Sequence, residues 1–128
     1  MTTSVEFLNE NSDLILKRFE APDEVREMLK GKFEIVTIAG QTLGRATYEP
    51  GWKWSEHVGQ ALGQSHCDVE HLGLVLSGQA TVAFDGEPVQ TVTPGTIFYV
   101  PKKPHDSWVV GDELFVSIHF LNADQYAK

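Results

Sequence analysis

The chain has 128 residues, enough for one domain with a sizeable hydrophobic core. Its formal net charge of −8 at pH 7 repels nucleic-acid phosphates and anionic membrane surfaces, so neither is an expected partner. A single cysteine, Cys67, excludes an intrachain disulfide. Together with the absence of a signal-peptide pattern at the start of the sequence, this favours a cytoplasmic location.

Residues 1–31 are expected to form a lead-in to the main fold. Residues 14–19 read as a candidate strand. Residues 21–30 are expected to form a short helical segment, because Pro22 and Asp23 suit the start of a helix and Gly31 suits its end.

From residue 32 onward the sequence predicts strands separated by turns. The last predicted strand has a period of two, with apolar side chains at 114, 116, 118 and 120 on one face. Short strands with turn signals every 8–12 residues indicate an all-β sandwich or barrel, and no long helices alternate with them. The predicted strands are residues 33–38, 42–48, 52–58, 72–76, 80–84, 89–92, 97–100, 107–110 and 114–120, with a longer loop at 60–70.

Three histidines lie on or beside different predicted strands: His57, His71 and His105. Histidine is the commonest metal ligand among the side chains. Residues on separate strands can meet at one point if the sheet closes on itself. The pattern therefore predicts a metal held inside a small β-barrel.

The spacing around these histidines resembles the two motifs of the cupin family. The first family motif is glycine, five residues, His-x-His, three or four residues, glutamate, six residues and glycine. The second is glycine, five residues, proline, one residue, glycine, two residues and histidine. The matching segments are Gly51-x5-His57, His71-x6-Gly78 and Gly95-x5-Pro101 followed by His105.

The resemblance implies a cupin double-stranded β-helix, a jelly-roll barrel over about residues 32–121 of a single domain spanning 1–128. It also implies that His57, His71 and His105 hold one divalent transition metal per chain, with zinc, iron, manganese and nickel as the candidates. The sequence departs from the family at four positions. Gly59 stands where a second histidine is expected and His71 where glutamate is expected. Lys103 replaces a glycine, and His105 arrives one residue early.

Several further residues are candidates for the same site. Glu56 or Glu70 is the candidate carboxylate, as an additional ligand or as a proton-transferring base. Neighbours on a strand point to opposite faces, so Glu56 and His57 are not both expected to face the cavity. Tyr99 is a candidate proton donor, and His119 is expected to be structural. Two weaker candidates for a fourth ligand, His66 and Cys67, lie in the loop before His71.

The expected function is that of an enzyme acting on a small organic molecule, of the dioxygenase, isomerase or lyase type. The alternative is a non-catalytic cupin module that binds or senses a small ligand or a metal. A homodimer is also expected. Its interface would use the apolar stripe formed by Leu72, Leu74 and Leu76, together with Trp52 and Trp54.

Overall fold

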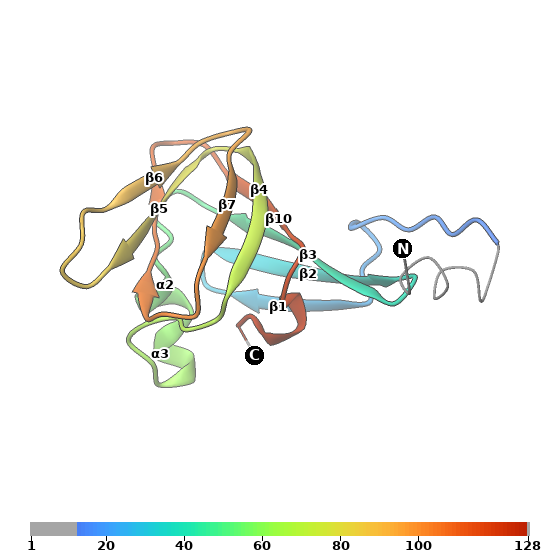
Figure 1. Cartoon of the computed structure of the whole chain (residues 1–128), viewed down its shortest axis with the longest axis horizontal. Helices are drawn as coiled ribbons and strands as arrows, with labels where there is room; N and C mark the ends of the chain where they lie inside the picture. Colours follow the sequence, from blue (N-terminus) through green and yellow to red (C-terminus); the bar gives the residue numbers. More distant parts are fainter. Residues whose placement is uncertain (1–12, 128) are drawn as a thin grey trace.

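The computed structural model describes residues 13–127, which form two antiparallel sheets (Figure 1). The first sheet has the strand order β1 (Glu24–Met28), β2 (Gly31–Ile38), β3 (Gln41–Tyr48), β10 (Phe115–His119), β4 (His71–Ser77) and β7 (Ile97–Val100). The second has the order β6 (Gln90–Val92), β5 (Gln79–Phe84) and β8 (His105–Asp106), and β9 (Val109–Val110) also pairs with β5. Three short helical segments complete the described part: α2 (Trp54–His57), α3 (Gly59–Leu62) and the 3-10 turn η1 (Ala123–Gln125).

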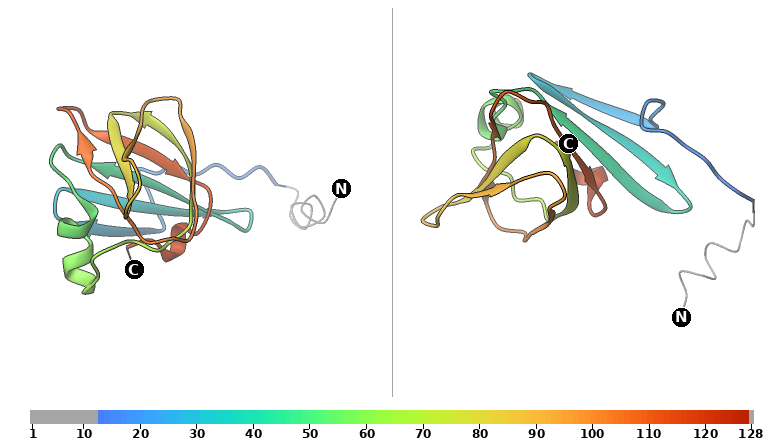
Figure 2. Two further views of the ribbon diagram at one scale, coloured as in Figure 1. Left: turned by 60° about the vertical axis from the view of Figure 1, so that its left-hand side comes forward. Right: turned by 90° about the horizontal axis from the view of Figure 1, so that it is seen from above.

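The all-β prediction is confirmed, and most of the predicted strands are present within one or two residues of their expected bounds. In Figure 2 the strands β1, β2 and β3 form one layer, and the later strands curve round to close the other side. The apolar side chains between the two sheets form the core, in which Phe33, Ala46 and Val75 are almost fully buried. No helix in the described range is both long enough and apolar enough to cross a membrane.

The lead-in differs from its prediction. Residues 1–12 lie outside the described residues, and residues 14–19 do not form a strand. Residues 24–28, expected to be helical, form β1 instead and pair with β2 in an antiparallel register from Glu24 opposite Ile35 to Met28 opposite Gly31. Pairing along the free edge of β2 satisfies the backbone of this segment, and such tertiary pairing overrides a weak local helix signal.

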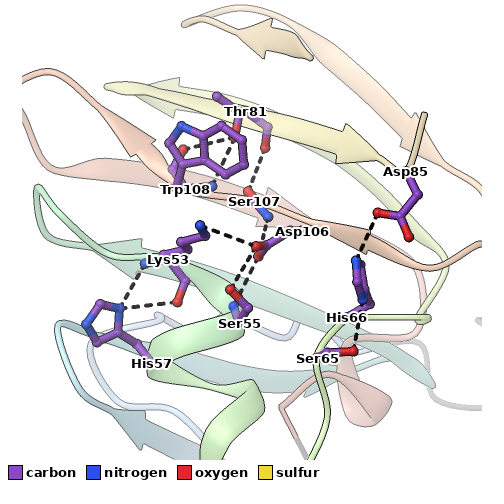
Figure 3. Close-up of polar contacts among 10 residues, drawn as sticks. All are labelled: Lys53, Ser55, His57, Ser65, His66, Thr81, Asp85, Asp106, Ser107 and Trp108. Atoms are coloured by element: carbon purple, nitrogen blue, oxygen red, sulfur yellow. Dashed lines mark hydrogen bonds and ion pairs between the residues drawn. The ribbon is translucent and has the colours of Figure 1, made fainter. Parts of the chain in front are cut away.

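The predicted strand at 52–58 is also wrong, because this segment turns into the helices α2 and α3. Lys53 is still extended, with φ −142° and ψ 129°, and the helix begins at the next residue. Asp106 of β8 fixes this helix start. Its Oδ1 accepts hydrogen bonds from the backbone N–H groups of Ser55 (3.0 Å) and Ser107 (2.9 Å), and its Oδ2 accepts one from the Ser55 hydroxyl (2.8 Å; Figure 3).

The last strand, β10, presents its less apolar face to the interior. Phe115, Ser117 and His119 are buried, whereas the predicted apolar face points outward and leaves Leu114 and Phe120 about half exposed, at 50% and 46%. Strand β4 follows the same rule: its buried positions are His71, Gly73 and Val75, and its leucines lie on the outer face. The polar positions of both strands therefore point into the barrel.

Candidate functional site

Two histidines and the cysteine meet at one end of the barrel. Cys67 lies just before β4 and exchanges two backbone hydrogen bonds with His105, of 2.8 and 2.9 Å. His105 is the first residue of β8, and His71 is the first residue of β4, opposite Val100 of β7. One ligand atom from each of Cys67, His71 and His105 lies within 4.8 Å of the other two, and all three residues are buried.

The protonation states of this group follow from its burial. Burial, reinforced by the neighbouring histidines, lowers the pKa of His71 to about 2, and burial also lowers the pKa of His105. Both imidazoles are therefore neutral at pH 7. Burial raises the pKa of the Cys67 thiol to about 11, so the thiol keeps its proton in the metal-free protein. Its sulfur lies 3.5 Å from His71 Nε2.

These donors fit a transition metal. The backbone carbonyl of Lys103 can only accept, so His105 Nδ1 donates to it (2.8 Å) and the Nε2 lone pair is left available. A hydrogen bond of this kind, from the second ring nitrogen to a carbonyl, is typical of metal-binding histidines. Soft sulfur and neutral imidazole nitrogen together suit zinc, iron and nickel.

His57, expected as the third ligand, lies away from this group. It is the last residue of helix α2 rather than a strand residue, and its Nδ1 accepts a hydrogen bond from the backbone N–H of Lys53 (2.9 Å; Figure 3). Together with Glu56 it borders a separate depression beside Met28 and Leu62. The set His57, His71 and His105 is therefore not assembled, because the helix turns residues 56 and 57 away from the barrel interior.

In a different register of the first cupin motif, Cys67 falls at a metal-ligand position of the motif. Starting from Gly59, five residues lead to Ser65, then one to Cys67, three to His71 and six to Gly78. This spacing matches the motif without an extended loop. Cys67 then occupies the second histidine position and His71 the glutamate position. Histidine identity favoured the register that begins at Gly51, whereas spacing alone favours the register that begins at Gly59.

The other expected site residues lie outside the interior. Tyr99 is 57% exposed on the outer face of β7, where its hydroxyl donates to Glu70. That contact raises the pKa of Tyr99. Glu70 also borders an open depression of about 600 Å³ that Cys67 and Trp54 line as well.

His66 also lies outside the group formed by Cys67, His71 and His105, which we call the ligand group. Its two ring nitrogens contact Ser65 Oγ at 3.0 Å and Asp85 Oδ1 at 3.2 Å (Figure 3). Of the two loop residues weighed as additional ligands, Cys67 is therefore the one that the fold brings to His71 and His105.

A cavity of about 60 Å³ lies next to the ligand group, between the two sheets. His71, His105 and His119 all line it. His119 was expected to be structural; its ring packs edge-on against His71 with 5.6 Å between ring centroids, and its Nε2 contacts Ser117 Oγ at 3.1 Å. Burial lowers the pKa of His119 to about 4. In the sequence, the only indication that His119 faces the cavity was its position on the same strand face as Phe115 and Ser117.

Aromatic side chains form much of the remaining cavity wall. The Tyr48 and Trp52 rings stack with 3.7 Å between centroids, and the Tyr48 hydroxyl donates to the Tyr126 hydroxyl (2.6 Å). Burial raises the pKa of both tyrosines well above the ordinary value. The indole N–H groups of Trp52 and Trp54 are buried and have no hydrogen-bond acceptor among residues 13–127. Both tryptophans are interior residues, so they are not available for the expected dimer face.

Comparison with known proteins supports the fold. No family model matches the sequence, and no curated protein matches it. Similar solved structures include a cupin-like protein from Thermotoga maritima, with 15% identity over 84% of this chain and 79% of that chain and a TM-score of 0.52. Ectoine synthase from P. lautus has 13% identity over 88% and 83%, with a TM-score of 0.59. A protein of unknown function from Rhizobium leguminosarum has 25% identity over 70% and 78%, with a TM-score of 0.53.

Proposed function

Because the chain has the fold of the cupin superfamily, we propose that it is an enzyme that holds one divalent transition metal through Cys67, His71 and His105. Its substrate is a small organic molecule that enters the barrel cavity. The observation that carries the proposal is the convergence of three buried donor atoms within 4.8 Å of one another. Burying such polar groups at one point costs free energy, and a bound cation offsets that cost.

The donor set narrows the choice of metal. Thiolate and imidazole suit zinc, iron and nickel, whereas manganese prefers oxygen ligands. Three protein ligands also leave room for a further ligand, which is the usual arrangement of a catalytic zinc site. When bound, such an ion supplies a Lewis acid for an oxygen atom of the substrate.

The groups of the chain itself bind the substrate and hold protons at defined atoms. Tyr48 donates to Tyr126, so the Tyr126 hydroxyl hydrogen remains available to a substrate acceptor. His119 is neutral, and its low pKa makes it a weak base that is suited to orienting a substrate rather than to removing a proton. In a partly enclosed and largely apolar cavity, such dipoles act more strongly than they do in bulk water. Glu70, beside the open depression that Cys67 also lines, is placed to exchange protons with solvent.

Metal analysis of purified protein variants tests the proposal. We expect about one metal ion per chain in the wild-type protein and loss of metal in Cys67→Ser and His105→Gln, because each change removes a donor atom from the group. The control variants are His57→Gln and His66→Gln, which change histidines outside the group and should retain the metal. In the cobalt-substituted protein, a thiolate-to-cobalt absorption band should disappear in Cys67→Ser and persist in both controls.

Two results would contradict this assignment. One is a wild-type protein that binds no zinc, iron, manganese or nickel in titrations. The other is loss of metal in His57→Gln while Cys67→Ser keeps it. A metal-loaded protein that turns over no member of a panel of small organic acids would favour the alternative, a non-catalytic binding module.

A further inference from the structure

Lys103 stands where the second cupin motif has a glycine, in the segment that connects β7 to β8. This segment comprises residues 101–104, all of which are exposed. Pro101 and Pro104 have no backbone N–H to donate, and within the described chain residues 101–104 make no backbone–backbone hydrogen bond. The conformation of the segment that leads into His105 therefore depends on other contacts.

Lys103 supplies such contacts with both its backbone and its side chain. Its backbone oxygen accepts a hydrogen bond from His105 Nδ1 (2.8 Å), which leaves Nε2 as the metal-binding nitrogen. Its ammonium group contacts the carboxylate of Glu87 and lies 4.5 Å from the centroid of the Phe84 ring. A cation over an aromatic face is attracted by the charge distribution of the ring. One residue thereby connects the His105 imidazole to the turn that follows β5.

The turn that receives the ammonium group is itself fixed. The backbone N–H of Glu87 donates to the backbone oxygen of Phe84 (3.2 Å), which closes the turn after β5. Phe84 is also the partner of His105 in the pairing of β5 with β8, and the centroids of the two rings lie 5.8 Å apart. Both anchors of the Lys103 side chain therefore belong to the strand and turn against which His105 already packs.

We propose that Lys103 is a positioning residue that holds the His105 imidazole in the orientation that binds the metal. This inference rests on the proposed function for the metal itself. The position before Pro104 restricts Lys103 to extended conformations, and the anchored side chain fixes its carbonyl further. Without these anchors the segment samples other arrangements. Metal binding must then order the ring, and the apparent affinity falls in proportion to the competent fraction.

Zinc affinity of the full-length protein, measured by competition with a chromophoric chelator, tests the proposal. Lys103→Ala removes the ammonium group but keeps a side chain before Pro104, and it should bind zinc about three- to tenfold more weakly. Lys103→Arg keeps a cation for Phe84 and Glu87, so its affinity should return to within about twofold of the wild-type value. The matched control is Lys102→Ala, because Lys102 lines the open depression instead. It loses the same charge and should bind zinc no more weakly than the wild-type protein.

The tautomer of His105 gives a second readout that needs no metal. In ¹⁵N-labelled, metal-free protein at pH 7, long-range ¹H–¹⁵N correlation spectra show which ring nitrogen carries the proton. His105 should carry it on Nδ1 in the wild-type protein, in Lys103→Arg and in Lys102→Ala, and should populate both tautomers in Lys103→Ala. The variant His105→Gln identifies the signals, since it removes them.

The two readouts separate failure of this inference from failure of the metal site. If the wild-type protein binds zinc and Lys103→Ala binds it as tightly, or keeps the single tautomer, the positioning role is refuted and the metal site stands. Equal weakening in Lys103→Ala and Lys102→Ala would also refute the positioning role, because the loss would then come from charge alone. If the wild-type protein binds no zinc but Lys103→Ala loses the single tautomer, the metal site is refuted and Lys103 still orients His105.

Discussion

His119 should make the stability of the metal-free protein depend on pH. Its pKa falls from 6.5 to about 4 in the folded protein because of burial, so the folded state favours the neutral ring. The unfolded chain binds a proton below pH 6.5, whereas the folded chain does so only near pH 4. The stabilisation is therefore complete above pH 6.5 and is lost as the pH falls from 6.5 toward 4. The full shift corresponds to about 3 kcal/mol, of which about 2 kcal/mol is lost between pH 7 and pH 5.

Urea unfolding in the presence of a chelator, at pH 7, 6 and 5, measures this loss in the wild-type protein and in His119→Gln. Glutamine keeps a polar group next to Ser117 and does not titrate. His71 and His105 also have lowered pKa values, so both proteins should lose stability in acid. The wild-type protein should lose about 2 kcal/mol more than the variant between pH 7 and pH 5. Parallel stability curves for the two proteins would refute the assignment of a buried, neutral ring at position 119.

Four further expectations can be checked with the same material. Tyr48→Phe and Tyr126→Phe should each lower the free energy of unfolding by about 1–3 kcal/mol, and the double variant by less than their sum, because the two hydroxyls share one buried hydrogen bond; additive losses would contradict this. Gly44→Ala should lower the free energy of unfolding in urea by about 1–3 kcal/mol, because the new Cβ would lie 2.2 Å from Phe33 Cζ. The control Gly86→Ala places its Cβ within 4 Å of no other atom, and should lose only about 1 kcal/mol because of the positive φ of 76°. Asp106→Ala should speed hydrogen exchange at the Ser55 and Ser107 amides, and unchanged exchange there would show that the carboxylate does not hold them. The outward stripe of Leu72, Leu74 and Leu76 is proposed as the homodimer face, so light scattering at micromolar concentration should give a dimer for the wild-type protein and a monomer for Leu76→Lys; a wild-type monomer would end the proposal.

A strand was predictable from the sequence where its two faces differ in hydrophobicity and where turn residues mark its ends. Segments such as β2, β3 and β7 combine branched or aromatic residues with flanking glycine or proline, and these signals are local. Helix α2 was missed because four residues are too few to show a helical period, and because the alternation of Trp52 and Trp54 imitates a strand. Strand β1 exists through its pairing with β2, which no local pattern reveals.

The site was predictable in part. His71 and His105 follow from their motif positions, and the structure brings them together. Cys67 was undervalued because a histidine at position 57 was given more weight than the spacing from Gly59. The buried face of strand β10 was also predicted wrongly. An apolar stripe is usually assigned to the core, but in this protein Ser117 and His119 face the interior, because polar groups line the barrel cavity.

The carboxylate of Asp106 connects parts of the molecule that are far apart in the sequence. It accepts from Ser55, the residue after Trp54, and it directly follows His105. One side chain thereby ties the start of α2, which carries Trp54, to β8, which carries His105. The groups that the proposed substrate would contact are therefore already held in place, so little conformational freedom would be lost when a small molecule binds.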